Sequence, residues 1–439
     1  MKKKLALFGG KKTIKNALMP YSSIGKDEER AALKVVKKKV LSNFIGSYEK
    51  DFRGNSFYGG NYVKKFERLF EKKFKIKHAV SVNSWTSGLT IAVASLDISP
   101  GDEIIVTPWT MTATVAAILH NNAIPVFVDI DKKTYNIDPM LIEKKITNRT
   151  KAILAVDIFG QSCDVKKLLK ISKKHNIKLI TDSAQSPGVN NELGITGTKS
   201  HIGGFSFNCH KHVQCGEGGI IVTNDTKIYN KLLLLRNHGE VVIDNPKFKV
   251  NKNLLTNLIG YNYRLSEIHA AIACEQVKKI NYYVKDRQRV AKVLFKGLKN
   301  LNGLELPYIA KKNSHAFYIF PINLKIDSLP NGITRKKIVA ALLAEGVTGL
   351  SEGYSNLHKL KLFKKKIAYG KKGFPWKIGK KLNKINYNKI CPNAEYLHEK
   401  SFITFELCLN KFTNYEINLV CKAFHKVWNN FDVLKKIKY

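Results

Sequence analysis

The stretch GGFSFNCHKHVQCGEGG, residues 203–219, decides how the rest of the chain is interpreted. It predicts a short strand over residues 202–208, a polar loop that carries Lys211, and a glycine-rich turn into a second strand over residues 218–223. A lysine held between two short strands is not part of a solvated surface. Lys211 is therefore the first candidate functional residue.

The groups around Lys211 are suited to binding an anion beside an amine. Gly216, Gly218 and Gly219 permit positive φ and a close approach of the backbone to a ligand, and Ser206 offers a hydroxyl. A lysine amine that is desolvated beside such a loop can act as a Schiff-base nucleophile, which is what pyridoxal 5'-phosphate (PLP) requires. We therefore interpret Lys211 as a candidate catalytic residue.

This loop has two other possible interpretations. Cys209, His210, His212 and Cys215 are possible zinc ligands, but their spacing is not that of the common zinc motifs, and neighbours on an extended strand point to opposite faces. We therefore expect no metal. A tight turn between two core strands would explain the glycines, but it gives no role to the lysine.

Length and composition indicate a globular protein with two domains. The chain has 439 residues, which is longer than the segment that one hydrophobic core usually serves, and 44% of its residues are hydrophobic. The net charge of +41 suggests a polyanionic partner, but the lysines are scattered and form no basic stripe with interleaved aromatic residues. We expect no nucleic-acid partner, although the charge would attract anionic substrates.

Cysteine usage and hydropathy predict a cytoplasmic protein. The seven cysteines show no regular framework spacing, which indicates reduced thiols. No apolar run approaches the roughly 18 to 20 residues of a membrane span, and the first residues lack the apolar core of a signal peptide. We expect no association with a membrane.

Helices and strands alternate from residue 62 onward, which is typical of a largely parallel sheet with helices on both faces. Expected helices cover residues 62–74, 86–96, 111–121, 139–145 and 165–174, and expected strands cover residues 79–83, 103–107, 125–128, 152–156 and 178–181. The alternation stops after Asp182, so we expect one of the two strands around Lys211 to be antiparallel. The predicted fold is α/β, with a mostly parallel seven-stranded sheet.

The domain organisation follows from the same pattern. We expect an N-terminal arm and helix in residues 1–60, a PLP-binding large domain in residues 61–285, and a smaller C-terminal α/β domain in residues 286–439. In the outer two parts, helices are expected over residues 26–41, 335–343 and 414–428 and strands over residues 317–322 and 402–406. The polar loop between residues 44 and 62 is placed like a lid or an interface segment.

Ligands of such sheets bind beyond the carboxyl ends of the strands. There, Asp182 could keep a pyridinium nitrogen protonated, and Gln185 could donate to the phenolate oxygen. Trp109 offers a flat surface for stacking, and Thr86 and Ser87 at a helix start, together with Ser206, suit a phosphate. Simpler roles were also weighed: Asp182 or Thr86 could cap a helix, and Trp109 could be part of the core.

Several motifs, in order, resemble the DegT-type (StrS-type) sugar aminotransferases, which are fold-type I PLP enzymes. They are NSWTSGL (83–89), GDEIIVTPWT (101–110), PVFVD (125–129), DSAQ (182–185), FSF (205–207) with Lys211 and GEGG (216–219), GYNYR (260–264) and CPNAE (391–395). The resemblance covers nearly the whole chain. Two positions depart from the family pattern: Trp85 stands where glycine is common, and Asp157 stands where many members have histidine.

The resemblance implies a role for each candidate residue. Lys211 would form the internal aldimine, Asp182 would pair with the ring nitrogen, and Gln185 would contact the 3-hydroxyl. The phosphate would be held by Thr86, Ser87 and Ser206. The family is dimeric with both sites at the interface, so Asn262 would reach the phosphate of the cofactor in the neighbouring subunit.

The predicted function is transamination. An amino acid, with glutamate favoured, would give its amine to a keto group on a nucleotide-linked sugar that feeds a surface polysaccharide or another glycan. Three alternatives remain open at this point. They are a keto-deoxysugar dehydratase of the same fold, which carries histidine at the lysine position, a cyclitol aminotransferase, and a non-enzymatic regulatory or DNA-binding relative.

Overall fold

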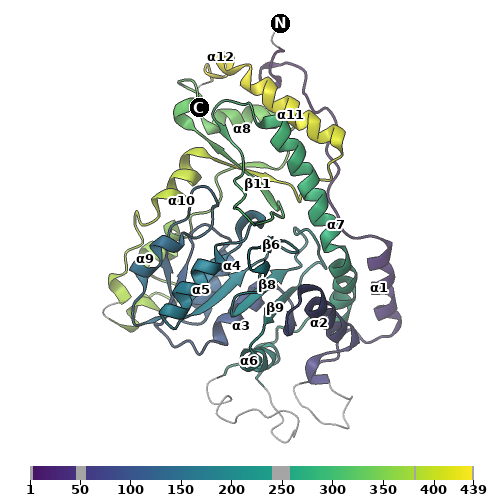
Figure 1. Ribbon diagram of the computed structural model, residues 1–439, viewed down its shortest axis with the longest axis vertical. Coiled ribbons are helices and arrows are strands. Elements are labelled where there is room, and N and C mark those ends of the chain that lie inside the picture. Colours follow the sequence, from purple (N-terminus) through teal and green to yellow (C-terminus); the bar gives the residue numbers. More distant parts are fainter. Residues whose placement is uncertain (1–2, 46–55, 240–257, 380–381, 438–439) are drawn as a thin grey trace, which may run out of the picture.

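Two sheets joined by one long helix make up the molecule (Figure 1). The computed structural model describes residues 3–45, 56–239, 258–379 and 382–437. Within these residues, the large sheet has seven strands, β1 (His78–Val82), β2 (Glu103–Val106), β3 (Ile124–Phe127), β4 (Thr150–Val156), β5 (Lys178–Asp182), β8 (Ile202–Ser206) and β9 (Gly219–Thr223). The small sheet has four, β10 (Leu304–Glu305), β11 (Ile319–Leu324), β12 (Leu350–Glu352) and β13 (Phe402–Glu406). A short hairpin, β6 (Asn190–Asn191) and β7 (Gly194–Ile195), lies apart from both.

The strand order of the large sheet confirms the predicted α/β class. The order is β1-β9-β8-β5-β4-β2-β3, and the pairs from β8 to β3 are all parallel. Strand β9 runs antiparallel to both β8 and β1. This confirms the expected antiparallel strand, because a loop without a helix connects β8 to β9.

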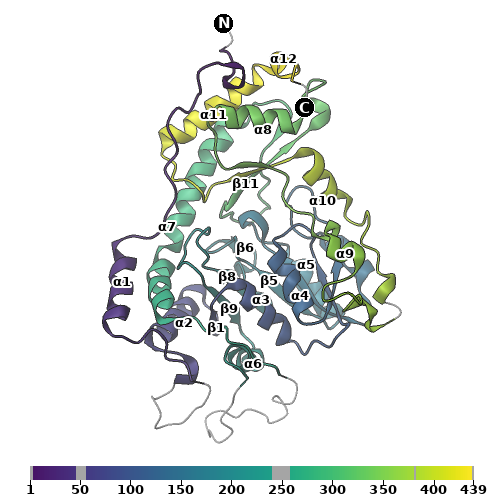
Figure 2. The same ribbon diagram turned by 180° about the vertical axis from the view of Figure 1, so that it is seen from behind.

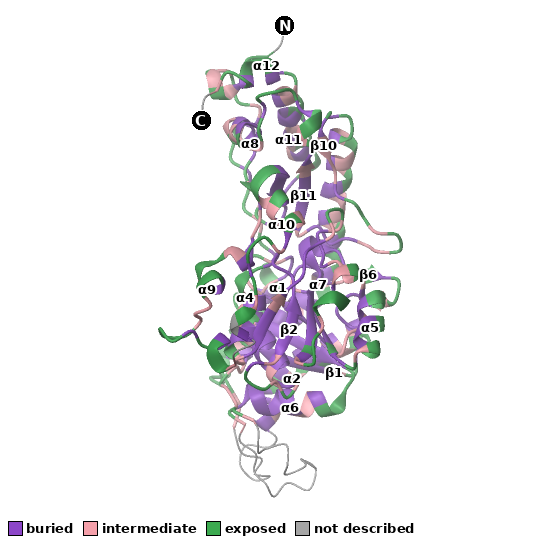
Figure 3. Ribbon diagram, turned by 90° about the vertical axis from the view of Figure 1, so that its left-hand side faces the viewer, coloured by how far each residue is buried: buried purple, intermediate pink, exposed green. Residues whose placement is uncertain are grey.

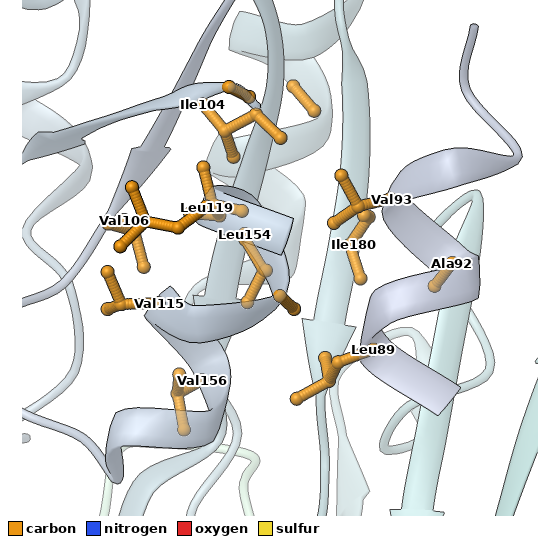
Figure 4. Packing of buried hydrophobic residues seen from close by; sticks show 14 of the residues in the cluster. Leu89, Ala92, Val93, Ile104, Val106, Val115, Leu119, Leu154, Val156 and Ile180 are labelled. Carbon is orange, nitrogen blue, oxygen red and sulfur yellow. The ribbon is translucent and has the colours of Figure 1, made fainter. Parts of the chain in front are cut away.

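Helices cover both faces of the large sheet. Helices α3 (Trp85–Ala94), α4 (Thr112–His120) and α6 (Thr226–Arg236) pack on one face, and α2 (Asn61–Phe74), α5 (Val165–Lys174) and α7 (Glu267–Leu298) pack on the other. Neighbouring strand residues therefore enter different cores. Ile104 and Val106 face α3 and α4 (Figure 4). Ile105 packs in the core that contains α5. Both strand faces are buried (Figure 3), which is why these strands are continuous apolar runs in the sequence.

Helix α7 connects the large sheet to the small one and is continuous through residue 285 (Figures 1 and 2). Helix α1 (Lys26–Lys37) and α2 lie along its first half. Its second half packs with α8 (Arg335–Ala344) and α11 (Asn414–Trp428) in the core of the small sheet, and α12 (Phe431–Leu434) adds to that core. The short helices α9 (Lys361–Lys365) and α10 (Pro392–Tyr396) belong instead to the α3 and α4 core. The domain boundaries given above remain a prediction.

Several expected elements differ from the structure in bounds or type. Residues 139–145 form two 3-10 turns, Pro139–Leu141 and Glu143–Lys145, in which backbone N–H groups bond the carbonyl three residues back and not four. Helix α1 ends at Lys37, before Lys39 turns to φ 57°. Strand β11 begins at Ile319, since Phe317 has φ 50° and cannot be extended. Most of the predicted lid, residues 46–55, lies outside the described residues.

Candidate active site

The loop that carries Lys211 extends the β8–β9 hairpin at the carboxyl edge of the large sheet. Phe207 N donates to Gly218 O at 2.9 Å, and Cys215 N donates to Phe207 O at 2.9 Å, so the paired backbone continues past β8. The Nζ of Lys211 lies 4.3 Å from the centroid of the Tyr318 ring. Burial lowers the pKa of the Lys211 amine, while the nearby Asp182 carboxylate acts in the opposite direction. This amine can therefore lose its proton more readily than an exposed lysine.

His212 fixes the loop from both sides. Its carbonyl accepts a hydrogen bond from the Tyr21 hydroxyl of the N-terminal arm, and its Nε2 lies 2.8 Å from Ala316 O. Burial lowers the pKa of His212 to about 3, so the ring is neutral and Nε2 donates to that carbonyl. The segment before β11 and the arm thus hold the lysine loop in place.

The four possible zinc ligands of the loop do not converge. Cys209 and His210 are exposed, whereas His212 is bonded as above and Cys215 is buried against α2 and α7. In the described part of the chain, no group of three or more histidine, cysteine, aspartate or glutamate side chains is arranged to hold a metal.

Asp182, the last residue of β5, is buried and accepts three hydrogen bonds. Its Oδ1 accepts from Trp85 Nε1 at 2.7 Å and from Ala184 N at 3.2 Å, and its Oδ2 accepts from Thr114 Oγ1 at 3.0 Å. Burial raises the pKa of Asp182, and the hydrogen bond from Trp85 is the largest of the effects that oppose this rise. Only one of these bonds is of the local capping type, so a cap alone does not account for this carboxylate.

Gln185 lies three residues further along the same edge. Its Oε1 accepts from Phe159 N at 2.6 Å, and its Nε2 donates to the Tyr354 hydroxyl at 3.3 Å. Phe159 has φ 59°, which is uncommon for a residue other than glycine. Because the backbone fixes Oε1, the amide nitrogen is the end of Gln185 that can donate to a ligand.

The start of α3 provides a place for a phosphate. Ser84 is its N-cap, since Ser84 Oγ accepts from Ser87 N at 3.1 Å, so Thr86 is exposed and does not serve as the cap. The N–H groups of Trp85 and Thr86 have no acceptor within the described residues. Free N–H groups at a helix start favour an anion. Ser206, at the end of β8, is buried, and its Oγ accepts from Asn208 N at 3.2 Å.

Asn262 is exposed, and its Oδ1 accepts from Arg264 Nε at 2.8 Å. The carbonyl of its neighbour Tyr263 accepts from Asn83 N at 2.9 Å, so this segment runs beside the start of α3. Its assignment to a second subunit's site remains a prediction.

Trp109 is completely buried, as the alternative core position would have it. Its ring packs edge-on against Phe402 at 5.2 Å between centroids and lies 5.7 Å from the ring of Tyr354. Its Nε1 has no hydrogen-bond partner among the described residues, which leaves one buried donor unsatisfied. The structure thus places Trp109 in a core position at the site edge, and stacking on a cofactor remains a prediction.

The assembled donor set fits PLP. The edge offers an amine, a buried carboxylate with a lone pair free on Oδ2, an amide that can donate, and a helix start with unpaired N–H groups. Sequence reasoning missed Tyr318, Tyr354 and Thr114. Tyr318 follows the lysine by about a hundred residues, and Tyr354 is still further along the chain. No local spacing could have indicated Tyr318 and Tyr354, whereas Thr114 lies in the first turn of α4, the helix that follows the end of β2.

Comparison with known proteins agrees with this geometry. The model of the DegT/DnrJ/EryC1/StrS aminotransferase family matches residues 42–377. The spore coat polysaccharide biosynthesis protein SpsC of Bacillus subtilis is 30% identical over 85% of this chain and 91% of its own length. GDP-perosamine synthase of Caulobacter vibrioides is 32% identical over 66% of this chain and 75% of its own.

Solved structures show the same fold. An aminotransferase from Psychrobacter cryohalolentis superposes with a TM-score of 0.79 at 25% identity, covering 94% of this chain and 100% of that one. A GDP-4-keto-6-deoxymannose-3-dehydratase with a trapped PLP-glutamate geminal diamine superposes with a TM-score of 0.73 at 26% identity, covering 93% of this chain and 100% of that one.

Proposed function

This chain belongs to the DegT/DnrJ/EryC1/StrS aminotransferase family of PLP-dependent enzymes, and we propose that it moves an amino group from an amino acid, glutamate being the favoured donor, to the keto group of a nucleotide-activated sugar. The observation that carries the proposal is the half-buried Lys211 amine near Asp182 at the carboxyl edge of the sheet, whose pKa burial lowers. The names of the related proteins support the sugar: one is a GDP-perosamine synthase, and one acts in spore coat polysaccharide biosynthesis. The product would enter a surface polysaccharide or a related glycan.

Each side chain has a role that follows from its position. Bound PLP supplies an electron sink for the bonds around the substrate carbon. Lys211 would hold the cofactor covalently and, as a free amine, would move a proton at the substrate carbon, because its lowered pKa makes a neutral amine accessible. Asp182 would hold the ring nitrogen, Gln185 Nε2 would orient the ring through its hydroxyl, and the α3 start with Thr86, Ser87 and Ser206 would hold the phosphate. The ring of Tyr318 lies over the lysine amine.

The dehydratase alternative has less support. It requires histidine in place of the lysine, and neither neighbouring histidine can take that role: His212 is buried and bonded to Ala316 O, and His210 is exposed. A cyclitol aminotransferase would use the same residues, so only substrates separate it from the proposal. A non-enzymatic regulator would have no need of the Lys211 and Asp182 arrangement.

We further propose a cytoplasmic homodimer in which Asn262 completes the partner's phosphate site. All seven cysteines are free, which suits a reducing compartment. No helix in the described residues is long and apolar enough to cross a membrane. The family's dimeric sites and the position of Asn262 beside the α3 start support the shared site.

Cofactor trapping and a substrate panel test the proposal. The purified protein, treated with borohydride in the presence of PLP, should carry a pyridoxyl group on Lys211 by peptide mass spectrometry, and the Lys211→Ala variant should carry none. With glutamate and a panel of nucleotide-linked keto-sugars, mass spectrometry of the sugar should show an amine in place of the ketone. An adduct on another residue would overturn the lysine assignment. Loss of a hydroxyl from the sugar, or amination of a keto-cyclitol alone, would overturn the substrate class.

A further inference from the structure

The side chain of Trp85 reaches from the first residue of α3 to the Asp182 carboxylate. The indole Nε1 donates to Asp182 Oδ1 at 2.7 Å, and both residues are 5% exposed. An indole N–H can only donate, so this contact favours the carboxylate over the carboxylic acid. Trp85 is therefore bonded to the group that pairs with the cofactor ring.

Two glycines create the space for this indole, and a third allows β9 to approach its backbone. A Cβ on Gly204 of β8 would lie 1.9 Å from Cη2 of Trp85, and a Cβ on Gly88 would lie 2.7 Å from its Cε3. A Cβ on Gly219 would lie 2.6 Å from the Trp85 backbone nitrogen. Gly204 is the residue that pairs with Asp182 across β5 and β8, so the ring lies over β8 directly beside the carboxylate. The indole cannot turn away without meeting α3 or the sheet.

The two carboxylate oxygens of Asp182 accept hydrogen bonds from different donors. A carboxylate has about four lone-pair positions. Trp85 and Ala184 N use Oδ1, while Thr114 uses one position on Oδ2. Within the described residues, the remaining position on Oδ2 is the one that a ring N–H can use.

We propose that Trp85 is a positioning residue of the PLP site, which holds Asp182 through Oδ1 so that Oδ2 faces the cofactor's ring nitrogen. The inference rests on the PLP chemistry of the proposed function. This role explains the tryptophan at residue 85, because a glycine there would leave Asp182 with one hydrogen-bond donor fewer. Because the Trp85 bond opposes the rise in the pKa of Asp182 that burial causes, it also extends the pH range in which that carboxylate is charged.

Two substitutions at Trp85 separate its N–H from its bulk. Trp85→Phe keeps a six-membered ring but removes the donor. Trp85→His removes the outer ring but keeps a ring N–H at the position that Nε1 holds in the indole. The matched control is Trp376→Phe, because Trp376 is also fully buried and donates Nε1 to the Tyr387 hydroxyl at 2.9 Å, away from Asp182.

The measurement is the dissociation constant of PLP from each apoprotein across a pH series, with thermal denaturation of the apoproteins alongside. Trp85→Phe should bind PLP about ten- to hundredfold more weakly, as expected for losing a hydrogen bond to a charged group. Its loss of PLP affinity on acidification should begin at a higher pH than in the wild type. Trp85→His should recover part of both properties, and Trp376→Phe should bind PLP like the wild type even where its stability falls.

Trp85→Phe combined with Asp182→Asn provides the test of mechanism. If Trp85 acts through Asp182, the double variant should bind PLP no more weakly than Asp182→Asn alone. Wild-type affinity and pH dependence in Trp85→Phe would overturn the inference, as would equal losses in Trp85→Phe and Trp376→Phe. Should Trp85→Phe fail to fold, Trp85→His takes its place: if Trp85→His combined with Asp182→Asn binds PLP more weakly than Asp182→Asn alone, Trp85 does not act through Asp182 and the inference is overturned. A wild-type protein that binds no PLP would instead refute the proposed function itself.

Discussion

Asp157 is a second buried carboxyl at the site edge, and replacing it with asparagine should stabilise the protein at neutral pH. It is 0% exposed, its Oδ1 accepts from Cys163 N at 2.8 Å, and its Oδ2 accepts from Ser183 Oγ at 2.5 Å. In Asp157→Asn, the amide oxygen can keep the first bond and the amide nitrogen can donate to Ser183 Oγ. The substitution therefore removes a buried charge while it keeps the shape and both partners.

The size of the effect follows from the pKa of Asp157. Burial raises it from 3.8 to about 6 in the folded protein. A carboxyl with a raised folded pKa contributes most stability below its unfolded pKa, and that contribution is lost as the pH rises through the folded value. At about 1.4 kcal/mol for each pH unit between the two values, ionisation of Asp157 costs about 3 kcal/mol near pH 7. Asp157→Asn does not incur this cost.

Urea denaturation of the apoprotein, repeated between about pH 4 and pH 8, measures the prediction. The free energy of unfolding of Asp157→Asn should exceed that of the wild type near pH 7 by up to about 3 kcal/mol, and the difference should shrink toward pH 4. Asp327→Asn is the control, because it makes the same substitution at an exposed residue and should follow the wild type at every pH. A constant difference between Asp157→Asn and the wild type over the whole range would refute the reasoning.

The remaining predictions concern the cofactor site and its packing. Asp182→Asn should keep the fold, checked by circular dichroism, but lose most transamination, because a neutral partner no longer holds a proton on the ring nitrogen; near-normal turnover would mean that another group holds the ring. Mixing Lys211→Ala and Asn262→Ala subunits should restore tight PLP binding at one site per hybrid dimer, while no recovery would place Asn262 in its own subunit's site. Gly204→Ala should lower the free energy of unfolding by about 1–3 kcal/mol, because the new Cβ would lie 1.9 Å from Trp85. A thermal shift assay of the double variant with Trp85→Phe should show that part of this loss is restored.

The large sheet was predictable because its strands are buried on both faces. Ile104, Ile105 and Val106 enter different cores, so the strand is a short unbroken apolar run with polar residues at its end. The connection between β8 and β9 has no helical pattern, and this alone indicated an antiparallel strand. Backbone departures were not predictable in the same way: Phe317 and Lys39 adopt positive φ without being glycine, so nothing in their type indicates that a strand begins late or a helix ends early.

The site was predictable as a set of strand ends but not as a network. Lys211, Asp182 and Gln185 follow apolar strands, and their residue types match the chemistry of one cofactor. Their partners depend on contacts between distant segments: Trp85 and Asp182 are 97 residues apart, and Gln185 and Tyr354 are 169 apart. The Trp85 contact also requires an absent side chain at Gly204, a steric condition that no single segment displays.

The two buried carboxyls at this edge are held by different groups. Asp157 N donates to Asp182 O at 2.9 Å, so the residues lie on adjacent strand ends, and the Asp182 charge adds to the rise that burial causes in the pKa of Asp157. Asp182 has Trp85, Thr114 and Ala184 N as donors and Lys211 as a nearby cation, whereas Asp157 has Ser183 and the Cys163 backbone. Removing the charge of Asp157 therefore leaves the donors of Asp182 in place. Asp157→Asn removes that charge at every pH, so its apoprotein should bind PLP at least as tightly as the wild type above about pH 6, and weaker binding there would mean that the Asp157 charge itself supports the site.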